Sequence, residues 1–198
     1  YMEPGDLSLV QGQPFGRMAS LEVFKDPERW FALEEAETRP LNDLDVADYR
    51  TFFKLKPPLR SEDDRLAVID AVATGLIDVI SSMHTPQDEE SKRLPFEEAA
   101  SGAIGLETLL PAAMRLVHGG YLDLPTLWRA LSLNPAKRLG LDAGRLAVGA
   151  RADLVLFDPD TPFVLDRSKL LSKSKNTPFD EARMQGKVLG TWVAGTKV

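Results

Sequence analysis

The stretch SEDDRLAVIDAVATGLIDVI, residues 61–80, decides the fold class of this chain. Ser61 is a good helix N-cap, and the three acidic residues that follow it suit the positive end of a helix dipole. Gly75 is a plausible helix stop. The apolar residues expected on one helical face are Leu66, Ile69, Ala73 and Leu76. The apolar run 77–80 then predicts a short buried strand, and a helix followed by a buried strand indicates an α/β fold.

Beyond this unit, the sequence predicts two further helices and, near residue 140, a change from a helical to a strand-like pattern. One helix is expected from about 106 to 117, before Gly119-Gly120, and another from about Pro125 to Asn134-Pro135. The intervening residues 81–101 are polar and predict a loop. Residues 153–157 and 188–193 have the apolar, β-branched character of strands, so residues 140–198 are expected to be β-rich.

Composition excludes several classes of protein. The net charge of −6 and the pI near 5.0 argue against nucleic acid and anionic membranes as partners. No apolar run approaches the length of a membrane span, and we expect a cytoplasmic protein. The absence of cysteine excludes disulfides and thiolate metal sites. With only two histidines, the chain can supply at most a carboxylate-rich metal site.

Four groups of residues resemble the dihydroorotase branch of the amidohydrolase superfamily in their order and spacing. They are LNDLDVADYRTFFKLKPPLRSED at 41–63, GLIDVISSMHTP at 75–86, PFEEA at 95–99 with GLET at 105–108, and GRL at 144–146 with GARADLVL at 149–156 and SKNTPF at 174–179. The resemblance covers about residues 41–198.

The resemblance implies an α/β fold, namely part of a (β/α)8 TIM-type barrel with a small β-sandwich built from both chain ends. We therefore expect a divergent or truncated barrel segment at 1–40, the C-terminal part of the barrel at 41–139 and a β-rich composite (sandwich) domain at 140–198. A full barrel needs about 250 residues. Either the chain is a genuine deletion or it is part of a longer protein, and a half-barrel would need a partner chain to cover its exposed apolar surface.

The resemblance also implies a site with two zinc ions, at which an Asp ligates metal and shuttles a proton. Met83 stands at the position of this Asp, and a thioether can neither carry that proton nor ligate a hard ion well. No paired His precedes Leu41. We therefore predict no intact catalytic residue, no metal site and no cofactor. The positions that match substrate-contacting ones are Lys56 in place of an Asn, Gln87 in place of a His, and the loop Ala100-Ser101-Gly102.

Simpler interpretations stand beside each candidate residue. His84 is expected to be structural, and His118 to complement a helix dipole at the surface. Met83 is expected to fill the vacated metal space. The charged residues at 89, 90, 92 and 93 are expected to form a solvated loop. Arg60 either grips an anionic ligand or pairs with Glu62 or Asp63, and the sequence leaves both alternatives open.

Three functions follow from these observations. The preferred hypothesis is a non-catalytic dihydroorotase-like protein of pyrimidine biosynthesis, which serves as a structural partner of aspartate transcarbamoylase or pairs with another copy of itself. The second is an active zinc-dependent dihydroorotase, which interconverts carbamoyl-aspartate and dihydroorotate, of which this is an incomplete chain. The third is a decayed remnant or a repurposed binding module.

Overall fold

The computed structural model describes residues 18–20 and 51–198. The expected segment 1–40 therefore lies almost wholly outside the described residues. The helices are η4 (Thr51–Phe53), α2 (Glu62–Ala73), α3 (Glu89–Arg93), α4 (Leu109–His118), α5 (Leu124–Trp128), η5 (Arg129–Leu133), α6 (Asn134–Arg138) and η6 (Arg167–Lys169). The strands are β1 (Met18–Ser20), β2 (Val79–Ser81), β3 (Leu154–Val164), β4 (Arg183–Val193) and β5 (Thr196–Lys197). Within the described ranges, no helix is long and apolar enough to cross a membrane.

Helix α2 begins and ends as its sequence predicts. The Ser61 hydroxyl accepts a hydrogen bond from the Asp64 backbone N–H at 3.2 Å, and the Asp64 carboxylate accepts one from the Ser61 N–H at 3.1 Å. This reciprocal capping box satisfies backbone donors that the first helical turn leaves without partners. Gly75 follows the helix with φ of 75°, a conformation that glycine adopts without steric cost.

The buried face of α2 differs from the predicted one. Ile69 and Leu76 face inward as expected, but Leu66 is 42% exposed and Ala73 is exposed. Arg65 and Val72 are buried in their place, with exposures of 4% and 3%. Arg65 tolerates burial because the Glu62 carboxylate pairs with its guanidinium, which also lies 5.5 Å from the centre of the Tyr121 ring.

Strand β2 overlaps the strand predicted at 77–80, but it begins two residues later and ends one residue later. It pairs in parallel with β1, with Met18 opposite Val79 and Ser20 opposite Ser81. Parallel pairing requires a crossover between the strands and is typical of sheets that are covered on both faces. The β1–β2 pair is the parallel sheet seen within the described residues.

The predicted end of the third helix at Asn134-Pro135 is wrong. The chain stays helical from Leu124 to Arg138, with a π-helical turn, η5, between α5 and α6. In this turn the Asn134 N–H bonds to the Arg129 carbonyl, five residues back. Pro135 has no N–H to donate, and it is tolerated here because the π turn has already displaced the α-helical hydrogen-bond register.

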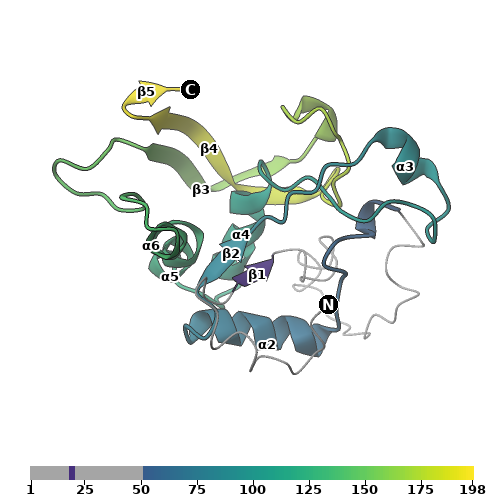
Figure 1. Ribbon diagram of the computed structural model, residues 1–198, viewed down its shortest axis with the longest axis horizontal. Coiled ribbons are helices and arrows are strands. Elements are labelled where there is room, and N and C mark those ends of the chain that lie inside the picture. The colour runs from purple at the N-terminus through teal and green to yellow at the C-terminus, as the bar shows by residue number, and fades with distance from the viewer. Residues whose placement is uncertain (1–17, 21–50) are drawn as a thin grey trace.

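One apolar core joins these helices to β2 and to the C-terminal strands. Its well-buried members include Ile69, Val72, Ile80, Ala113, Met114, Leu116, Leu127 and Met184. They come from α2, β2, α4, α5 and β4, so the α/β body and the β-rich end share a continuous interior. In Figure 1, α4 and β2 lie between α2 on one side and the β3–β4 sheet on the other.

The β-rich end is an antiparallel sheet in the order β3-β4-β5. Both strands that the sequence predicts are present, although β3 and β4 each extend over 11 residues. Their pairing shifts register between Leu156 and Phe157 and again between Asp158 and Pro162. Phe157 packs edge-on against Trp128, with ring centres 5.4 Å apart, and this contact ties the sheet to α5. The division at residue 140 stays a prediction.

Candidate functional site at the carboxyl end of strand β2

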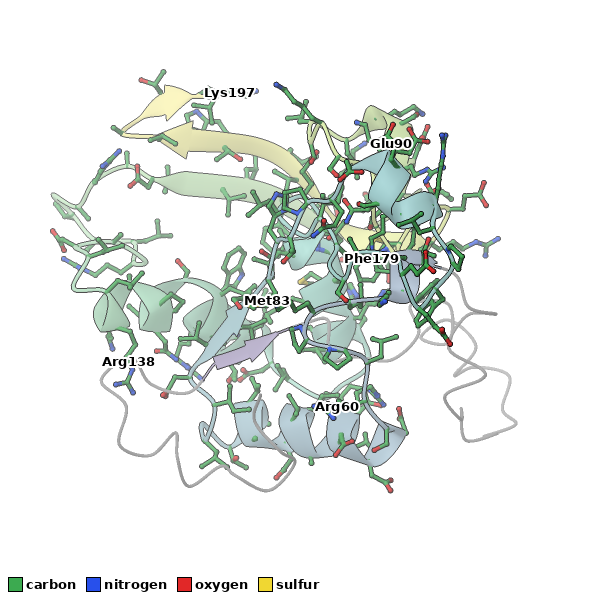
Figure 2. All side chains as sticks on the ribbon, turned by 45° about the vertical axis from the view of Figure 1, so that its right-hand side comes forward. Arg60, Met83, Glu90, Arg138, Phe179 and Lys197 are labelled. Carbon is green, nitrogen blue, oxygen red and sulfur yellow. The ribbon has the colours of Figure 1, made fainter. Side chains whose placement is uncertain are left out.

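Met83 follows the carboxyl end of β2 after one intervening residue, and Figure 2 shows it close to that strand. This end of a parallel strand is where barrel enzymes carry their functional side chains. Met83 has φ of 46°, a left-handed conformation that residues other than glycine seldom adopt, and it is 43% exposed. The Thr85 hydroxyl donates a hydrogen bond of 2.7 Å to the Met83 carbonyl.

His84 has backbone partners, as a structural histidine should. Its Nδ1 accepts hydrogen bonds from the N–H groups of Gly105 at 3.0 Å and Leu106 at 3.4 Å. These bonds tie the turn after β2 to residues 105–106. His118 ends α4, and its Nε2 lies 3.9 Å from the largely exposed carboxylate of Asp160. Both positions agree with the simpler interpretations of the two histidines.

The structure brings together Gln87 and the loop 100–102, two of the positions that the resemblance matches to substrate-contacting positions of the family. The Gln87 side-chain amide donates a hydrogen bond of 3.0 Å to the Ser101 carbonyl. The Gly102 N–H donates to the Lys54 carbonyl at 2.8 Å, and the Ala100 N–H donates to the Ser91 carbonyl at 3.1 Å. The loop 100–102 is therefore fixed by backbone contacts, and the Gln87 amide is already engaged with it.

Glycine is required at position 102. Its φ is 124°, and a Cβ built there would lie 2.7 Å from the Thr85 Cβ. Lys56, in contrast, is exposed and makes no hydrogen bond or ion pair within residues 51–198. The structure thus holds Gln87 and residues 100–102 as one cluster but does not join Lys56 to it.

Asn176 organises this cluster, and the sequence analysis did not single it out as a site residue. Its side chain is 3% exposed. Its Oδ1 accepts hydrogen bonds from the Gln87 N–H at 3.2 Å and from the Ser174 hydroxyl at 2.8 Å, and its Nδ2 donates to the Gly102 carbonyl at 3.0 Å. One buried amide therefore joins three segments. The SKNTPF segment carried the resemblance, but no local pattern indicates this role.

Lys92 corrects the prediction of a solvated loop at residues 89–93. These residues form α3, and Lys92 is 3% exposed. Its ammonium donates hydrogen bonds to the carbonyls of Thr51 at 2.9 Å and Lys54 at 3.1 Å. Glu89, Glu90 and Arg93 are exposed as expected, and Glu89 and Arg93 form an ion pair of 2.6 Å. Lys92 holds η4, and with it the chain leading to Lys56, against α3.

Of the two alternatives for Arg60, the pair with Glu62 or Asp63 is not formed within the described residues. Glu62 pairs with Arg65, at 2.5 Å and 2.8 Å for the two hydrogen bonds. Arg60 is half-buried just before α2, where Figure 2 labels it. The alternative of an anionic ligand at Arg60 stays a prediction.

The described residues do not fit a hard divalent metal. Among residues 18–20 and 51–198, no group of three or more His, Asp or Glu side chains is placed to hold one. Hard cations need several oxygen or imidazole ligands at once, and the Met83 thioether is a poor substitute. No metal-dependent step is therefore derived for these residues.

The sequence model described as "Amidohydrolase family" matches residues 35–198, and the chain therefore belongs to the amidohydrolase family. This agrees with the parallel β1–β2 pair, the helix–strand unit and the position of residue 83. A second model, "Prokaryotic glutathione synthetase, N-terminal domain", matches residues 1–62, most of which lie outside the described residues.

Within the family, the chain is similar to dihydroorotases. It is 41% identical over 180 residues to the dihydroorotase of Ehrlichia chaffeensis, covering 89% of this chain and 40% of that protein. It is 46% identical over 163 residues to the dihydroorotase of Desulforapulum autotrophicum, covering 80% and 38%. The chain thus spans about 40% of the length of these curated relatives.

Solved structures agree on the fold. The L-hydantoinase (dihydropyrimidinase) of Arthrobacter aurescens superimposes with a TM-score of 0.81 at 27% identity, covering 100% of this chain and 43% of that one. A D-hydantoinase superimposes with a TM-score of 0.71 at 20% identity, covering 91% and 38%. The predicted fold class, a partial (β/α)8 barrel with a β-rich end, is confirmed at the level of the family.

Proposed function

We propose that this chain is a non-catalytic, dihydroorotase-like protein of pyrimidine biosynthesis, and that it acts as a structural partner of aspartate transcarbamoylase. The observation that carries the proposal is Met83 at the carboxyl end of β2. The family resemblance implies a proton-shuttling carboxylate at this position, and a thioether cannot carry that proton. The Gln87 amide, which the Ser101 carbonyl engages, supports the same conclusion.

The catalytic half of the proposal is tested by metal analysis and a dihydroorotate ring-opening assay on the purified protein. We expect no stoichiometric zinc and no turnover that a chelator abolishes. The matched variant is Met83→Leu, which keeps the apolar character and approximate size of the side chain. Any trace rate from a contaminating enzyme should be the same in Met83→Leu as in the parent. Stoichiometric zinc with chelator-sensitive turnover would overturn the proposal.

The partnership is supported by apolar residues that the sheet leaves exposed, among them Leu154, Leu156 and Leu189, at 40%, 54% and 52%. Such a surface is typical of an interface with another chain. The test is co-purification with aspartate transcarbamoylase subunits, with Leu156→Lys as the variant that should weaken it. Unchanged assembly and activity of the transcarbamoylase after deletion of this protein would contradict the partnership.

A second function is favoured by one observation. The chain spans only about 40% of the dihydroorotases it resembles, so it is also compatible with one portion of an active zinc-dependent enzyme. The intact mass of the purified protein separates the two cases. A mass near 21.9 kDa agrees with the first proposal, and a mass about twice as large, together with bound zinc and turnover, supports the second.

A further inference from the structure

A cleft of about 740 Å³ lies beside the candidate site and shares Gln87 and Asn176 with it. It is lined by Phe52, by residues 86–89, by Lys92 of α3, and by residues 167–168 and 172–176. Met83, Lys56 and residues 100–102 of the candidate site do not line it. Figure 2 marks α3 by Glu90, at one edge of the molecule. The volume falls within the usual range for small-molecule sites.

Arg167 is held in place within this cleft. Its Nε lies 3.0 Å from the Asp180 carboxylate, and its backbone N–H donates to the same carboxylate at 3.1 Å. Its guanidinium carbon lies 4.9 Å from the centre of the Phe52 ring, which also lines the cleft. Its terminal nitrogens have no hydrogen-bond partner within the described residues. A guanidinium fixed by stacking and one ion pair has lost much of its conformational freedom before any ligand binds.

The other charges of the cleft also favour an anion. Its lining carries four basic side chains, Lys92, Arg167, Lys173 and Lys175, against two acidic ones, Asp88 and Glu89, and the Asp180 carboxylate, outside the lining, pairs with Arg167. One basic side chain is therefore in excess, in a chain whose net charge is −6. Glu89 is paired with Arg93 outside the cleft. Lys175 donates to the neutral Leu170 carbonyl at 2.6 Å, so no carboxylate cancels its charge there. Lys173 is exposed and makes no ion pair within the described residues.

We propose that this cleft binds a small oxyanion, the phosphate or carboxylate group of a ligand, between Arg167 and Lys173. The planar guanidinium edge can donate two parallel hydrogen bonds to such a group, and Lys173 supplies a mobile second charge. Phe52 provides an apolar surface for the body of the ligand. The proposal does not depend on whether the carboxyl end of β2 is catalytic, because Met83 is absent from the lining.

The test is calorimetric titration of the purified protein with inorganic phosphate in one arm and succinate in the other. We expect saturable binding in at least one arm, and the arm that binds identifies the source of the oxyanion. Lys173→Ala should weaken binding about tenfold, since a hydrogen bond to a charged group contributes at least that factor. Arg167→Lys, which keeps the charge but loses the planar fork, should weaken it by a similar factor.

The matched control is Lys169→Ala. Lys169 belongs to η6, its side chain is 83% exposed, and it does not line the cleft. The Lys169→Ala variant removes one positive charge from the same segment without changing the cleft. If direct contacts in the cleft determine the affinity for the oxyanion, that affinity should change by less than about twofold. Equal losses in Lys169→Ala and Lys173→Ala would indicate general charge attraction and overturn the proposal, as would the absence of saturable binding in both arms. Circular dichroism spectra of each variant establish that the comparison is between folded proteins.

Discussion

Two buried polar side chains, Asn176 and Lys92, join segments that lie far apart in the sequence. The Asn176 side chain connects Gln87 with Gly102, and the Lys92 side chain connects α3 with η4. Buried polar groups stabilise a fold only when their partners are present, and they specify which segments must meet. The geometry around Gln87 and the 100–102 loop therefore depends on Asn176 and Lys92, which the sequence analysis did not name as site residues.

Replacement of Asn176 by Ala should lower the free energy of unfolding by about 2–4 kcal/mol. The reason is that it leaves the Gln87 N–H and the Gly102 carbonyl unpaired, at roughly 1–3 kcal/mol for each buried group. Urea unfolding measures the loss. Asn134→Ala is the matched control, because its side chain makes one partly buried bond, of 2.9 Å, to the Asp78 carbonyl. It should cost about 1 kcal/mol. Equal losses in the two variants would show that Asn176 does not join the segments.

Lys92→Met should lower the free energy of unfolding by about 2 kcal/mol, because the carbonyls of Thr51 and Lys54 lose a charged donor. The neighbouring Arg93→Met is the control. The Arg93 side chain is 70% exposed and pairs only with the exposed Glu89, so its loss should stay below about 0.5 kcal/mol. If urea unfolding ranked the two variants in the opposite order, the buried position of Lys92 would be wrong.

Among the secondary-structure elements, the helix caps were the features most accurately predicted by the local sequence. The Ser61 cap and the Gly75 stop of α2 are both confirmed. Caps depend on residues within one turn of each other, so tertiary contacts seldom override them. The continuation through Pro135 was not predictable, since the displaced hydrogen bonds of η5 leave no mark in the amino-acid types.

The cap of α5 should make stability depend on pH. The Thr126 hydroxyl and the Thr126 backbone N–H, at 2.7 Å from Asp123 Oδ1, hold the pKa of Asp123 below its ordinary value of 3.8. A lowered pKa means that this contribution is fully present above that value and is lost as the pH falls through the folded pKa. Asp123→Asn keeps an acceptor but does not titrate.

We therefore expect the urea midpoint to fall less between pH 6 and pH 3 in Asp123→Asn than in the parent protein. Asp70→Asn is the control, because no hydrogen bond to the Asp70 carboxylate is found within the described residues. It should follow the parent. An identical pH dependence in parent, Asp70→Asn and Asp123→Asn would show that the Asp123 cap does not contribute to it.

At the scale of the whole molecule, the sheet β3-β4-β5 is only partly covered. Phe157 contacts α5, but Leu154, Val155, Leu156, Val188 and Leu189 are between 40% and 54% exposed. Successive side chains of a strand point to opposite faces of the sheet, so the consecutive apolar residues Leu154, Val155 and Leu156 place apolar side chains on both faces. Figure 1 shows this sheet projecting at the side of the molecule opposite α2.

Leu156→Lys should reduce both self-association in sedimentation experiments and the binding of an apolar fluorescent dye, with little change in the urea midpoint. The substitution places a charge within the exposed apolar surface. Leu171→Lys is the control. Leu171 is 91% exposed but lies in the 167–176 segment, away from the sheet, and should leave both measurements unchanged. If the two variants behaved alike, the sheet would not be an association surface.

The sequence by itself determined the helix–strand unit of residues 61–80 and the places in the chain of strands β3 and β4. These features depend on periodicity, caps and residue chemistry, which are local. Tertiary structure decided which face of α2 is buried, where Arg65 replaces Leu66 because Glu62 and Tyr121 accept its guanidinium. It also decided the burial of Lys92, the central position of Asn176 and the cationic cleft. Each of these depends on groups that are distant in the chain, and only packing determines which of them meet.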